Sequence, residues 1–444
     1  MKKFPNAIVI ILLVILVAWV LTFIIPQGSY NRIVDKTTEI TTVVPNSYHV
    51  QDSSPLSVFD LMLAIPRGIA GRADLVVLIL LLGGCFYLIE KTGALSQGLN
   101  QLMKGLSGKE SLALIIITLL FLTAGFTIAL QEELIAMTPI LLLFGRSIGY
   151  NAKTMVAASL GSAVVGASFS PFNPFGVVIA QKEAGVALLS GYEFRLIVLA
   201  IASMVWILYI LYYSRKNRIE KSDLNVETET FSFRNKLILS LLAITFVIVT
   251  YGLIKLEWGY NEMSACFFVL GLVCGTIAGY SFNKTTEVYI EGFKEMIFAA
   301  LIIGLANGVS VILREGMVID TIVYGLFGPL AHLPATLSAV LMMASHAVIH
   351  FPMPSTSGHA ILTMPILSPL ADLIGLSRQV CVLAYQYSAI MMDLIVPTNG
   401  ATMAVIALAG INYKNWLKFI AKPVFIMLSI GAVAIVIAIQ IGYH

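Results

Sequence analysis

The sequence predicts an all-α polytopic membrane protein with two inverted repeats, each containing a re-entrant helical hairpin and a broken transmembrane helix. Hydrophobic residues make up 58% of the 444 residues and charged residues only 11%, whereas soluble domains carry about 25% charged residues. Two apolar runs, Ala152–Leu189 and Ser377–Ile411, exceed the ~20 residues that cross a bilayer. Each run contains a proline near its middle, and the two runs share features at a constant spacing.

The first half of the chain, residues 1–213, contains three simple apolar segments of transmembrane length. The first, Ala7–Ile25, resembles a signal peptide, but no small-x-small cleavage motif follows it, so we expect a retained span. The other two spans are expected at Asp74–Ile89 and Phe194–Tyr213. Two amphipathic segments are expected to lie at the membrane interface, namely Leu56–Arg72 and Ala94–Lys109.

A charged linker, residues 214–236, separates the two halves. Its basic residues are Arg215, Lys216, Arg218, Lys221, Arg234 and Lys236. The positive-inside rule places this linker in the cytoplasm, together with Lys2 and Lys3 at the N-terminus. We therefore expect a cytoplasmic N-terminus in a protein of the cytoplasmic (inner) membrane.

The second half, residues 237–444, also alternates between apolar and polar segments. Transmembrane spans are expected at Leu237–Ile254, Glu262–Tyr280, Met296–Leu313 and Pro423–Ile441. The charged stretch Thr285–Lys294 is expected to be a separate interfacial segment. Three lysines before the last span indicate a cytoplasmic end, namely Lys414, Lys418 and Lys422.

Each half contains a pair of apolar arms that join at a polar tip, which is typical of a re-entrant hairpin. The first pair is Ser111–Leu130 and Leu134–Phe144, and its tip is Gln131-Glu132-Glu133. The second pair is Leu333–His350 and Gly358–Leu370, and its tip is Phe351-Pro-Met-Pro-Ser-Thr-Ser357. We call these the first tip and the second tip.

The two overlong runs are interrupted at Pro171-Phe-Asn-Pro174 and at Pro397-Thr-Asn-Gly400, which we call the first break and the second break. Proline removes a backbone donor and clashes with the preceding turn, so neither run is expected to remain one helix. In a membrane, freed backbone groups must find partners or line a polar cavity. Interrupted helices of this kind are typical of transporter binding sites.

The breaks and the hairpins repeat at an offset of 226 positions (365 − 139). This offset pairs Pro139 with Pro365, and Asn173 with Asn399. Counting the spans from a cytoplasmic N-terminus makes the first hairpin enter from the cytoplasm and the second from outside. The two repeats are thus antiparallel, which is the arrangement of many secondary transporters.

Several motifs resemble the YfcC-like family, which is close to the anaerobic four-carbon dicarboxylate carriers in the ion transporter superfamily. They are Glu132-Glu133, Asn173-Pro-Phe175, Pro354-Ser-Thr-Ser-Gly358, Leu362-Thr-Met-Pro-Ile-Leu367, Pro369-Leu-Ala-Asp372 and Ser377-Arg-Gln379. The resemblance extends from about Phe59 to Lys418. It implies a homodimer with a scaffold domain and a transport domain that moves by an elevator mechanism. Members of this branch are described as basic amino acid antiporters or as dicarboxylate carriers.

The sequence departs from the family pattern just before the second break. Where the family has a Gly-Asp-Gly stretch, this chain has Ser388-Ala389-Ile390, and an acidic residue appears instead at Asp393. Asn399 stands where the family usually has Ser. These differences fall at the expected site, so the resemblance does not establish the substrate or the coupling ion.

The candidate substrate-binding residues are those of the tips and breaks, namely Glu132, Glu133, Asn173, Ser355, Thr356, Ser357, Gly358, Thr398 and Asn399. Amides, hydroxyls and the N-termini of half-helices favour a carboxylate. Carboxylates inside a membrane are costly and indicate function. The alternatives are that Asn and Ser only cap helices and that a glutamate pairs with Arg146.

Four residues are candidates for binding a coupling Na⁺ or proton, namely Glu132, Glu133, Asp393 and His359. His346 and His350 have the i, i+4 spacing of a zinc helix, but no third ligand is evident, so packing or hydrogen bonding within the hairpin is favoured. The four cysteines show no metal-binding spacing and are expected to pack in the interior. No cofactor is expected.

These features favour a secondary active transporter, not an enzyme, that carries a small carboxylate-bearing solute. An amino acid fits best, because its ammonium group suits the glutamates of the first tip. The alternative is a four-carbon dicarboxylate or another organic anion, carried together with Na⁺ or H⁺. The expected partners are membrane lipid and a second copy of the chain; no basic patch with interleaved aromatics indicates nucleic acid.

Overall fold

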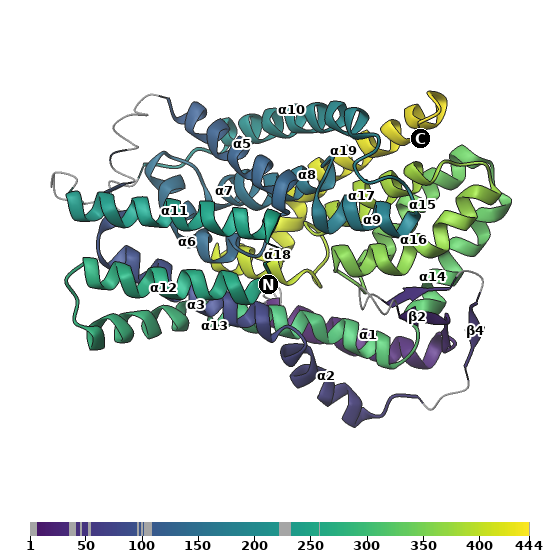
Figure 1. The fold of residues 1–444 in the computed structure, drawn as a ribbon, viewed down its shortest axis with the longest axis horizontal. Helices are drawn as coiled ribbons and strands as arrows, with labels where there is room; N and C mark the ends of the chain where they lie inside the picture. The colour runs from purple at the N-terminus through teal and green to yellow at the C-terminus, as the bar shows by residue number, and fades with distance from the viewer. Residues whose placement is uncertain are drawn as a thin grey trace.

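The structure is a computed structural model that describes residues 7–443, except 35–40, 45–46, 52–54, 96, 99–100, 102–108, 222–231 and 257. Lys2 and Lys3 lie outside the described residues, as do much of the expected interfacial segment Ala94–Lys109 and residues 222–231 of the expected linker. The described chain is mostly helical (Figure 1).

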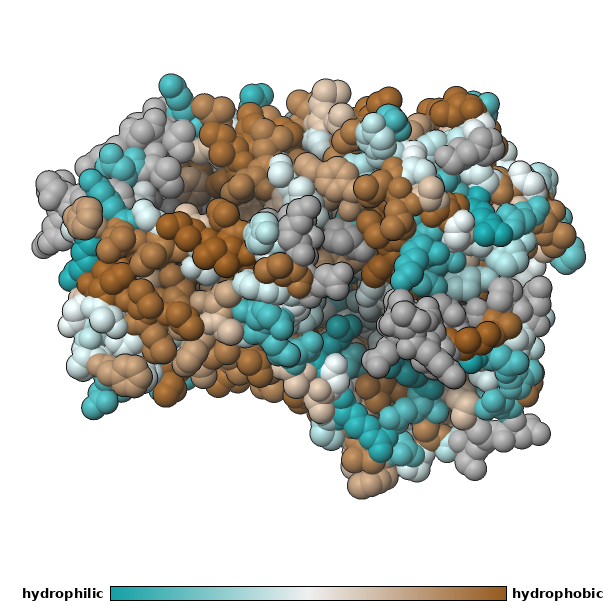
Figure 2. Space-filling model, viewed as in Figure 1, coloured by the Kyte–Doolittle hydropathy of each residue, from teal (hydrophilic) through white to brown (hydrophobic). Residues whose placement is uncertain are grey.

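Six of the described helices are long and apolar enough to cross a membrane. They are α3 (Ala73–Lys91), α5 (Glu110–Ile128), α10 (Tyr192–Lys216), α12 (Tyr260–Ile277), α13 (Phe282–Glu315) and α19 (Tyr413–Gln440). Helices α1 (Ala7–Ile24) and α11 (Phe233–Lys255) are also apolar. Hydrophobic residues cover the face over α11 and α12 (Figure 2). The prediction of a polytopic, helical membrane protein is confirmed.

Helix α13 corrects one prediction, because the interfacial stretch and the following span form one continuous helix of 34 residues. The charged side chains of Lys284, Glu287 and Glu291 lie on its exposed side. The opposite side is buried, with Thr285 and Gly292 among its residues. Because no proline interrupts the segment and its charges share one face, the helix continues without a break.

The polar loop after α1 contains four short strands that sequence patterns did not predict. Strand β1 (Gly28–Ser29) pairs with β4 (His49–Val50), and β2 (Arg32–Val34) pairs with β3 (Thr41–Val43), both antiparallel. Arg32 also binds Asp320 of α14 (Ile319–Phe327), another unpredicted element, which continues into a 3₁₀ turn at Gly328–His332. These contacts attach the loop to the helices.

Both predicted hairpins are helical on each side of their tips. The first consists of α5 and α6 (Leu134–Ser147), and the second of α15 (Ala335–His350) and α16 (Thr356–Leu373). Prolines lie inside α6 and α16, yet both helices continue past them.

Both predicted breaks are confirmed. The first run forms α7 (Ala152–Val156), the π-helix η1 (Ala157–Gly161) and α8 (Ser162–Ser168), stops, and resumes as η2 (Pro174–Val178) and α9 (Ile179–Ala184). The second run forms α17 (Arg378–Met392), stops, and resumes as α18 (Gly400–Leu408). Helix α19 begins before Pro423, which lies inside it.

The helices pack as two groups (Figure 1). The α13 group consists of α1, α2 (Val58–Ala70), α3, α12 and α13, with α13 at its centre. The hairpin group consists of both hairpins and both broken helices, with α17 packed between α15 and α19. The two groups meet where α18 lies on α13 and where α6 lies on α3.

Candidate functional site

A cavity of about 330 Å³ lies between the two helix groups. The hairpin group supplies most of its polar lining, namely Gln131, Glu132, Glu133, Ser355, Thr356, Ser357, Asp393, Thr398 and Asn399. The α13 group supplies Arg72, Tyr260, Asn307 and Ser310, together with apolar side chains. Eight of the eleven candidate residues identified from the sequence therefore line one cavity, although they come from three separate segments.

The first tip is formed where α5 ends and α6 begins. Ala129 adopts a left-handed conformation with φ of 54°, which turns the chain towards Gln131. Glu133 is 9% exposed, and its Oε2 atom has no hydrogen-bond partner within the described residues. A buried carboxylate oxygen without a partner is costly in its charged form. The first tip is therefore suited to a cation or a proton.

The second tip leads directly into α16. The hydroxyl of Ser355 accepts a hydrogen bond of 3.3 Å from the backbone N–H of Gly358, so Ser355 caps the helix. The hydroxyl of Tyr385 donates to the carbonyl oxygen of Thr356 at 2.6 Å and thereby fixes the first turn of α16 against α17. The N-terminus of α16, which favours negative charge, thus lies at the cavity.

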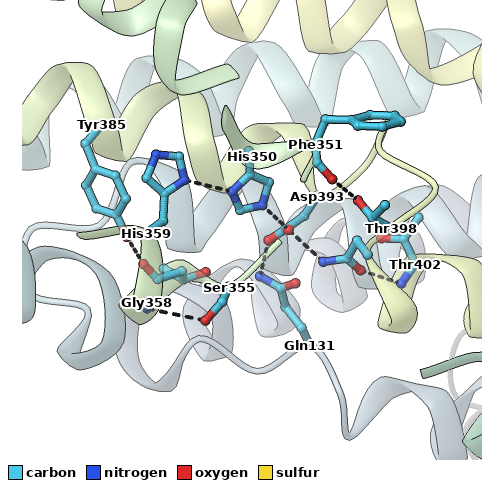
Figure 3. Close-up of polar contacts among 12 residues, drawn as sticks. Gln131, His350, Phe351, Ser355, Gly358, His359, Tyr385, Asp393, Thr398 and Thr402 are labelled. Carbon is cyan, nitrogen blue, oxygen red and sulfur yellow. Dashed lines mark hydrogen bonds and ion pairs between the residues drawn. The ribbon is translucent and has the colours of Figure 1, made fainter. Parts of the chain in front are cut away.

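A buried carboxylate, Asp393, lies just before the second break and is only 2% exposed as a residue. The amide of Asn399 donates to Asp393 Oδ1 at 2.6 Å, and the amide of Gln131 donates to Oδ2 at 3.2 Å. The oxygen of Asn399 accepts a hydrogen bond of 2.8 Å from the N–H of Thr402 and so caps α18. Asp393 therefore joins the second break to the first tip (Figure 3).

The second break also contacts the second tip. The hydroxyl of Thr398 donates to the carbonyl oxygen of Phe351 at 2.6 Å. The three segments are consequently held together by side-chain hydrogen bonds, as the close-up shows (Figure 3). A solute in the cavity would touch all three segments at once.

Three candidate residues do not line this cavity. Asn173 is fully buried, and its oxygen accepts from the N–H groups of Phe175 and Gly176, so it caps the helix after the first break. Its Nδ2 atom has no hydrogen-bond partner within the described part of the chain. Gly358 lines a second cavity, of about 300 Å³, near Arg32. His359 is buried inside the hairpin group.

The three histidines of the second hairpin form a hydrogen-bonded row, and its continuation through His359 and to Asp393 was not predicted from the sequence. His346 contacts His359 at 2.8 Å, His359 contacts His350 at 3.3 Å, and His350 contacts Asp393 at 2.7 Å. All three rings are fully buried. The i, i+4 spacing of His346 and His350 was the available signal, because it places both on one face of α15.

A buried arginine, Arg195, was also not predicted from the sequence. Arg195 of α10 is fully buried and donates to Gln379 at 2.8 Å, to Gln386 at 3.1 Å and to the carbonyl oxygen of Ser190 at 2.8 Å. Gln386 in turn donates to the carbonyl oxygen of Ser170, just before the first break. This network connects α10 with α17 and the first break, away from the cavity.

The cavity combines opposite electrostatic preferences. Its lining contains three carboxylates, those of Glu132, Glu133 and Asp393, and Arg72 is the one basic side chain among the described lining residues. The N-termini of α16 and α18 favour negative charge on the same wall. In the described residues, no group of three or more His, Cys, Asp or Glu side chains is arranged to hold a metal ion.

Comparisons with known proteins agree with the resemblance seen in the sequence. The chain is 31% identical over 395 residues to an Escherichia coli (strain K12) protein named "Putative basic amino acid antiporter YfcC", covering 83% of this chain and 78% of that protein. It is 29% identical over 498 residues to an uncharacterized protein of Haemophilus influenzae (strain Rd), covering 99% and 97% of the two chains.

The solved structure of the YdaH transporter from Alcanivorax borkumensis aligns with 99% of this chain and 99% of that one, at 15% identity and a TM-score of 0.46. The family of C4-dicarboxylate anaerobic carriers matches residues 4–440, almost the whole chain. The predicted resemblance to the YfcC-like family is confirmed. The chain belongs to the C4-dicarboxylate anaerobic carrier family of membrane transporters.

Proposed function

We propose that the protein is a secondary active transporter of a cationic, carboxylate-bearing solute, and that the solute is a basic amino acid. The observation that carries this proposal is the charge of the cavity, which has three carboxylates and one guanidinium among its described lining residues. A net negative cavity of this kind attracts a cation and repels a dianion. The name of the Escherichia coli relative points to the same solute class.

The cavity offers a partner for each group of a basic amino acid. The carboxylate of the solute binds at the N-terminus of α16, where Ser355, Thr356 and Ser357 supply hydroxyls. Thr398 and Asn399 contribute at the start of α18. The α-ammonium and the side-chain cation bind Glu132 and Glu133 of the first tip.

A carboxylate oxygen at the first tip that has no hydrogen-bond partner among the described residues supports coupling to an ion. Glu133 Oε2 has no partner among the described residues, and Asp393 is buried beside the same cavity. Na⁺ or a proton at Glu132, Glu133 or Asp393, or a proton at His359, would compensate the negative charge when the solute is absent. Exchange of the solute against this cation is therefore the mode of transport that we propose.

The inverted repeats are part of the same proposal. Support comes from matched element orders: a hairpin, a broken helix and a long apolar helix follow one another in both halves, ending with α10 and α19. The domain division at residues 1–213, 214–236 and 237–444 follows from this order. Asn173 and Asn399, at matching positions in the repeat, each cap the helix that follows a break.

An elevator mechanism and a homodimer complete the proposed architecture. Nine polar lining residues belong to the hairpin group, whereas the α13 group contributes four polar residues together with apolar side chains. This asymmetry supports movement of the hairpin group, with its bound solute, along a fixed α13 group. The location in the inner membrane, with a cytoplasmic N-terminus, rests on the basic residues of the linker.

Transport into proteoliposomes distinguishes the solute classes. Purified protein is reconstituted, and uptake of radiolabelled arginine, glutamine and succinate is measured with and without the unlabelled solute inside the vesicles. We expect counterflow of arginine, little of glutamine and none of succinate. Exchange of succinate alone would refute the proposal and would favour the alternative, a four-carbon dicarboxylate carrier that binds its substrate at Arg72 and the helix N-termini with Na⁺ or H⁺.

A further inference from the structure

The row of buried histidines runs from the cavity wall into the second hairpin. It begins at Asp393, which lines the cavity, and continues through His350 and His359 to His346. The contacts between neighbours measure 2.7, 3.3 and 2.8 Å in that order. Figure 3 shows the part of the row from His359 to Asp393. These are hydrogen-bond distances between groups that exchange protons.

While Asp393 is ionised, one arrangement of protons on the ring nitrogens satisfies all three hydrogen bonds of the row. An ionised carboxylate only accepts hydrogen bonds, so His350 carries its proton on Nε2 and leaves Nδ1 as an acceptor. His359 then donates from Nδ1 to His350, and His346 donates from Nδ1 to His359 Nε2. The last nitrogen, His346 Nε2, is a bare acceptor, and within the described residues it has no hydrogen-bond partner.

We propose that Asp393, His350, His359 and His346 form a proton relay that accepts one proton at His346 Nε2 and presents one at Asp393, on the cavity wall. The new proton binds His346 Nε2, and the Nδ1 proton of His346 moves to His359 Nε2. The Nδ1 proton of His359 moves to His350 Nδ1, and the Nε2 proton of His350 moves to Asp393 Oδ1. Only N–H and O–H bonds change, and the net charge rises from minus one to zero.

Both arrangements keep every hydrogen bond in the row. In the second one, Asp393 donates to His350 Nε2, and the direction of each contact along the row is reversed. Asn399 and Gln131 continue to donate to the carboxyl group. All three rings have exchanged tautomer, and none has become a buried imidazolium, whose desolvation would be costly.

The described side chains packed on the histidine rings do not offer a competing proton acceptor. From α17, the Tyr385 ring lies 5.5 Å from the His359 ring, but its hydroxyl already donates to Thr356. From α14, Phe327 packs on His346 with ring centroids 5.3 Å apart. From the first tip, Glu132 and Glu133 face the cavity that Asp393 lines. No described group packed on the three rings therefore competes with Asp393 for the relayed proton.

The relay gives the proposed exchange of solute against a proton a physical basis. This link between the relay and transport rests on the proposed function. A proton on Asp393 removes one of the three negative charges of the cavity. A cationic solute then binds less tightly, so solute and proton oppose each other through one carboxylate. His346 and His350 are thus assigned to coupling in addition to packing.

Solid-state ¹⁵N NMR of the full chain in lipid bilayers tests the relay without any solute. Histidine-labelled protein contains six histidines, and the variants His346→Gln, His350→Gln and His359→Gln assign the signals of the row. His332→Gln removes a histidine outside the row and is the control. As the pH is lowered, we expect the three rings to exchange their protonated nitrogen together, and we expect Asp393→Asn to abolish this exchange.

Other outcomes overturn the relay. They are separate titration of the rings to imidazolium, fixed tautomers wherever the protein is folded, or exchange that persists in Asp393→Asn. A second measurement compares arginine uptake driven by a proton gradient with arginine–arginine exchange, and His346→Gln should lower the ratio of the first to the second. Joint tautomer exchange without arginine transport would refute the proposed function alone, whereas arginine transport with fixed tautomers would refute the relay alone.

Discussion

Asp393 illustrates how one buried side chain connects the segments of the cavity. Its carboxylate accepts hydrogen bonds from Asn399, Gln131 and His350, which come from three different elements. These donors replace the water that the carboxylate loses on burial. Asn399 also caps α18, so the start of that helix and the charged group depend on the same side chain.

We expect Asn399→Asp to destabilise the protein at neutral pH and less so at acidic pH. The new carboxylate still caps α18, but it no longer donates to Asp393 and places a second negative charge within hydrogen-bond distance. At lower pH, a proton shared between the two carboxyl groups removes the repulsion. The melting temperature in detergent at pH 8 and at pH 5 measures this difference.

The matched control is Asn412→Asp, because Asn412 caps α19 by accepting from the N–H of Lys414. It should leave the melting temperature nearly unchanged at both pH values, since surface changes of this kind alter stability by about 0.5 kcal/mol or less. Equal behaviour of the two variants would contradict the assigned role of Asn399.

We also expect Glu132→Gln and Glu133→Gln to weaken arginine binding, because each removes a carboxylate from the cavity. A hydrogen bond to a charged group contributes about 1.5–3 kcal/mol, which corresponds to roughly a ten- to hundredfold change in Kd. Isothermal titration calorimetry with arginine measures the effect, and Glu193→Gln, in the first turn of α10, is the control. Normal affinity in both tip variants would exclude them from the binding site.

For individual residues, polar side chains within apolar segments of the sequence correctly indicated most of the polar residues that line the cavity. Glu132, Ser355 and Asn399 were identified because such groups are costly in a membrane unless they have a function or a partner. The histidine row could not be predicted, because its contacts depend on how α15 and α16 are rotated against each other. The spacing of His346 and His350 predicts that they share one face of α15, but it does not predict that His359 of α16 lies beside them.

The contact between α18 and α13 depends on a glycine at the start of α18. A Cβ atom at Gly400 would lie 2.8 Å from the Cα of Ile303, which is backbone and cannot rotate away. We therefore expect Gly400→Ala to destabilise the protein by about 1–3 kcal/mol, as overpacking does. Thermal unfolding in detergent measures this loss.

Gly325→Ala in α14 is the control, because nothing lies within 4 Å of its Cβ position. Alanine should be neutral there or stabilise the helix by roughly 0.5–1 kcal/mol. If Gly400→Ala were as stable as the natural protein, then α18 and α13 would have to be less tightly packed than the structure indicates.

Helices and breaks were largely predictable from apolar run length and proline. Both overlong runs stop and restart around their Pro-x-Asn motifs, because the asparagine caps the next helix where the proline has ended the first. The expected split of α13 was wrong, because charge alone does not end a helix whose other face is buried. The short strands escaped prediction because segments of two or three residues carry no periodic pattern.

The whole molecule is organised around the boundary between the α13 group and the hairpin group. The cavity lies on this boundary, and Ser310 of α13 donates to the carbonyl oxygen of Pro352 at the second tip. No sequence pattern specified which helices form each group, because that depends on side-chain fit between segments far apart in the chain. The proposed elevator mechanism requires that contacts across this boundary break during transport.

Cross-linking across the boundary tests that requirement. In a variant without the four natural cysteines, Ser310→Cys and Pro352→Cys are joined by a short bis-methanethiosulfonate reagent. The atoms Ser310 Oγ and Pro352 O lie 3.1 Å apart, so the two thiols are within reach of the reagent. If the hairpin group moves against the α13 group, we expect cross-linking to stop arginine uptake and reduction to restore it.

The control joins two helices of the α13 group. Arg67 of α2 and Glu315 of α13 form an ion pair of 2.7 Å, so Arg67→Cys with Glu315→Cys is cross-linked by the same reagent. Uptake should continue in this variant, because α2 and α13 belong to one group and need not separate. Inhibition of both pairs would indicate movement within the α13 group, and uptake through a fully cross-linked Ser310–Pro352 pair would rule out the proposed relative motion. Only the Ser310–Pro352 pair crosses the boundary between the two helix groups, whereas both pairs undergo the same chemical modification. The comparison therefore separates the effect of blocking movement between the groups from the effect of the modification.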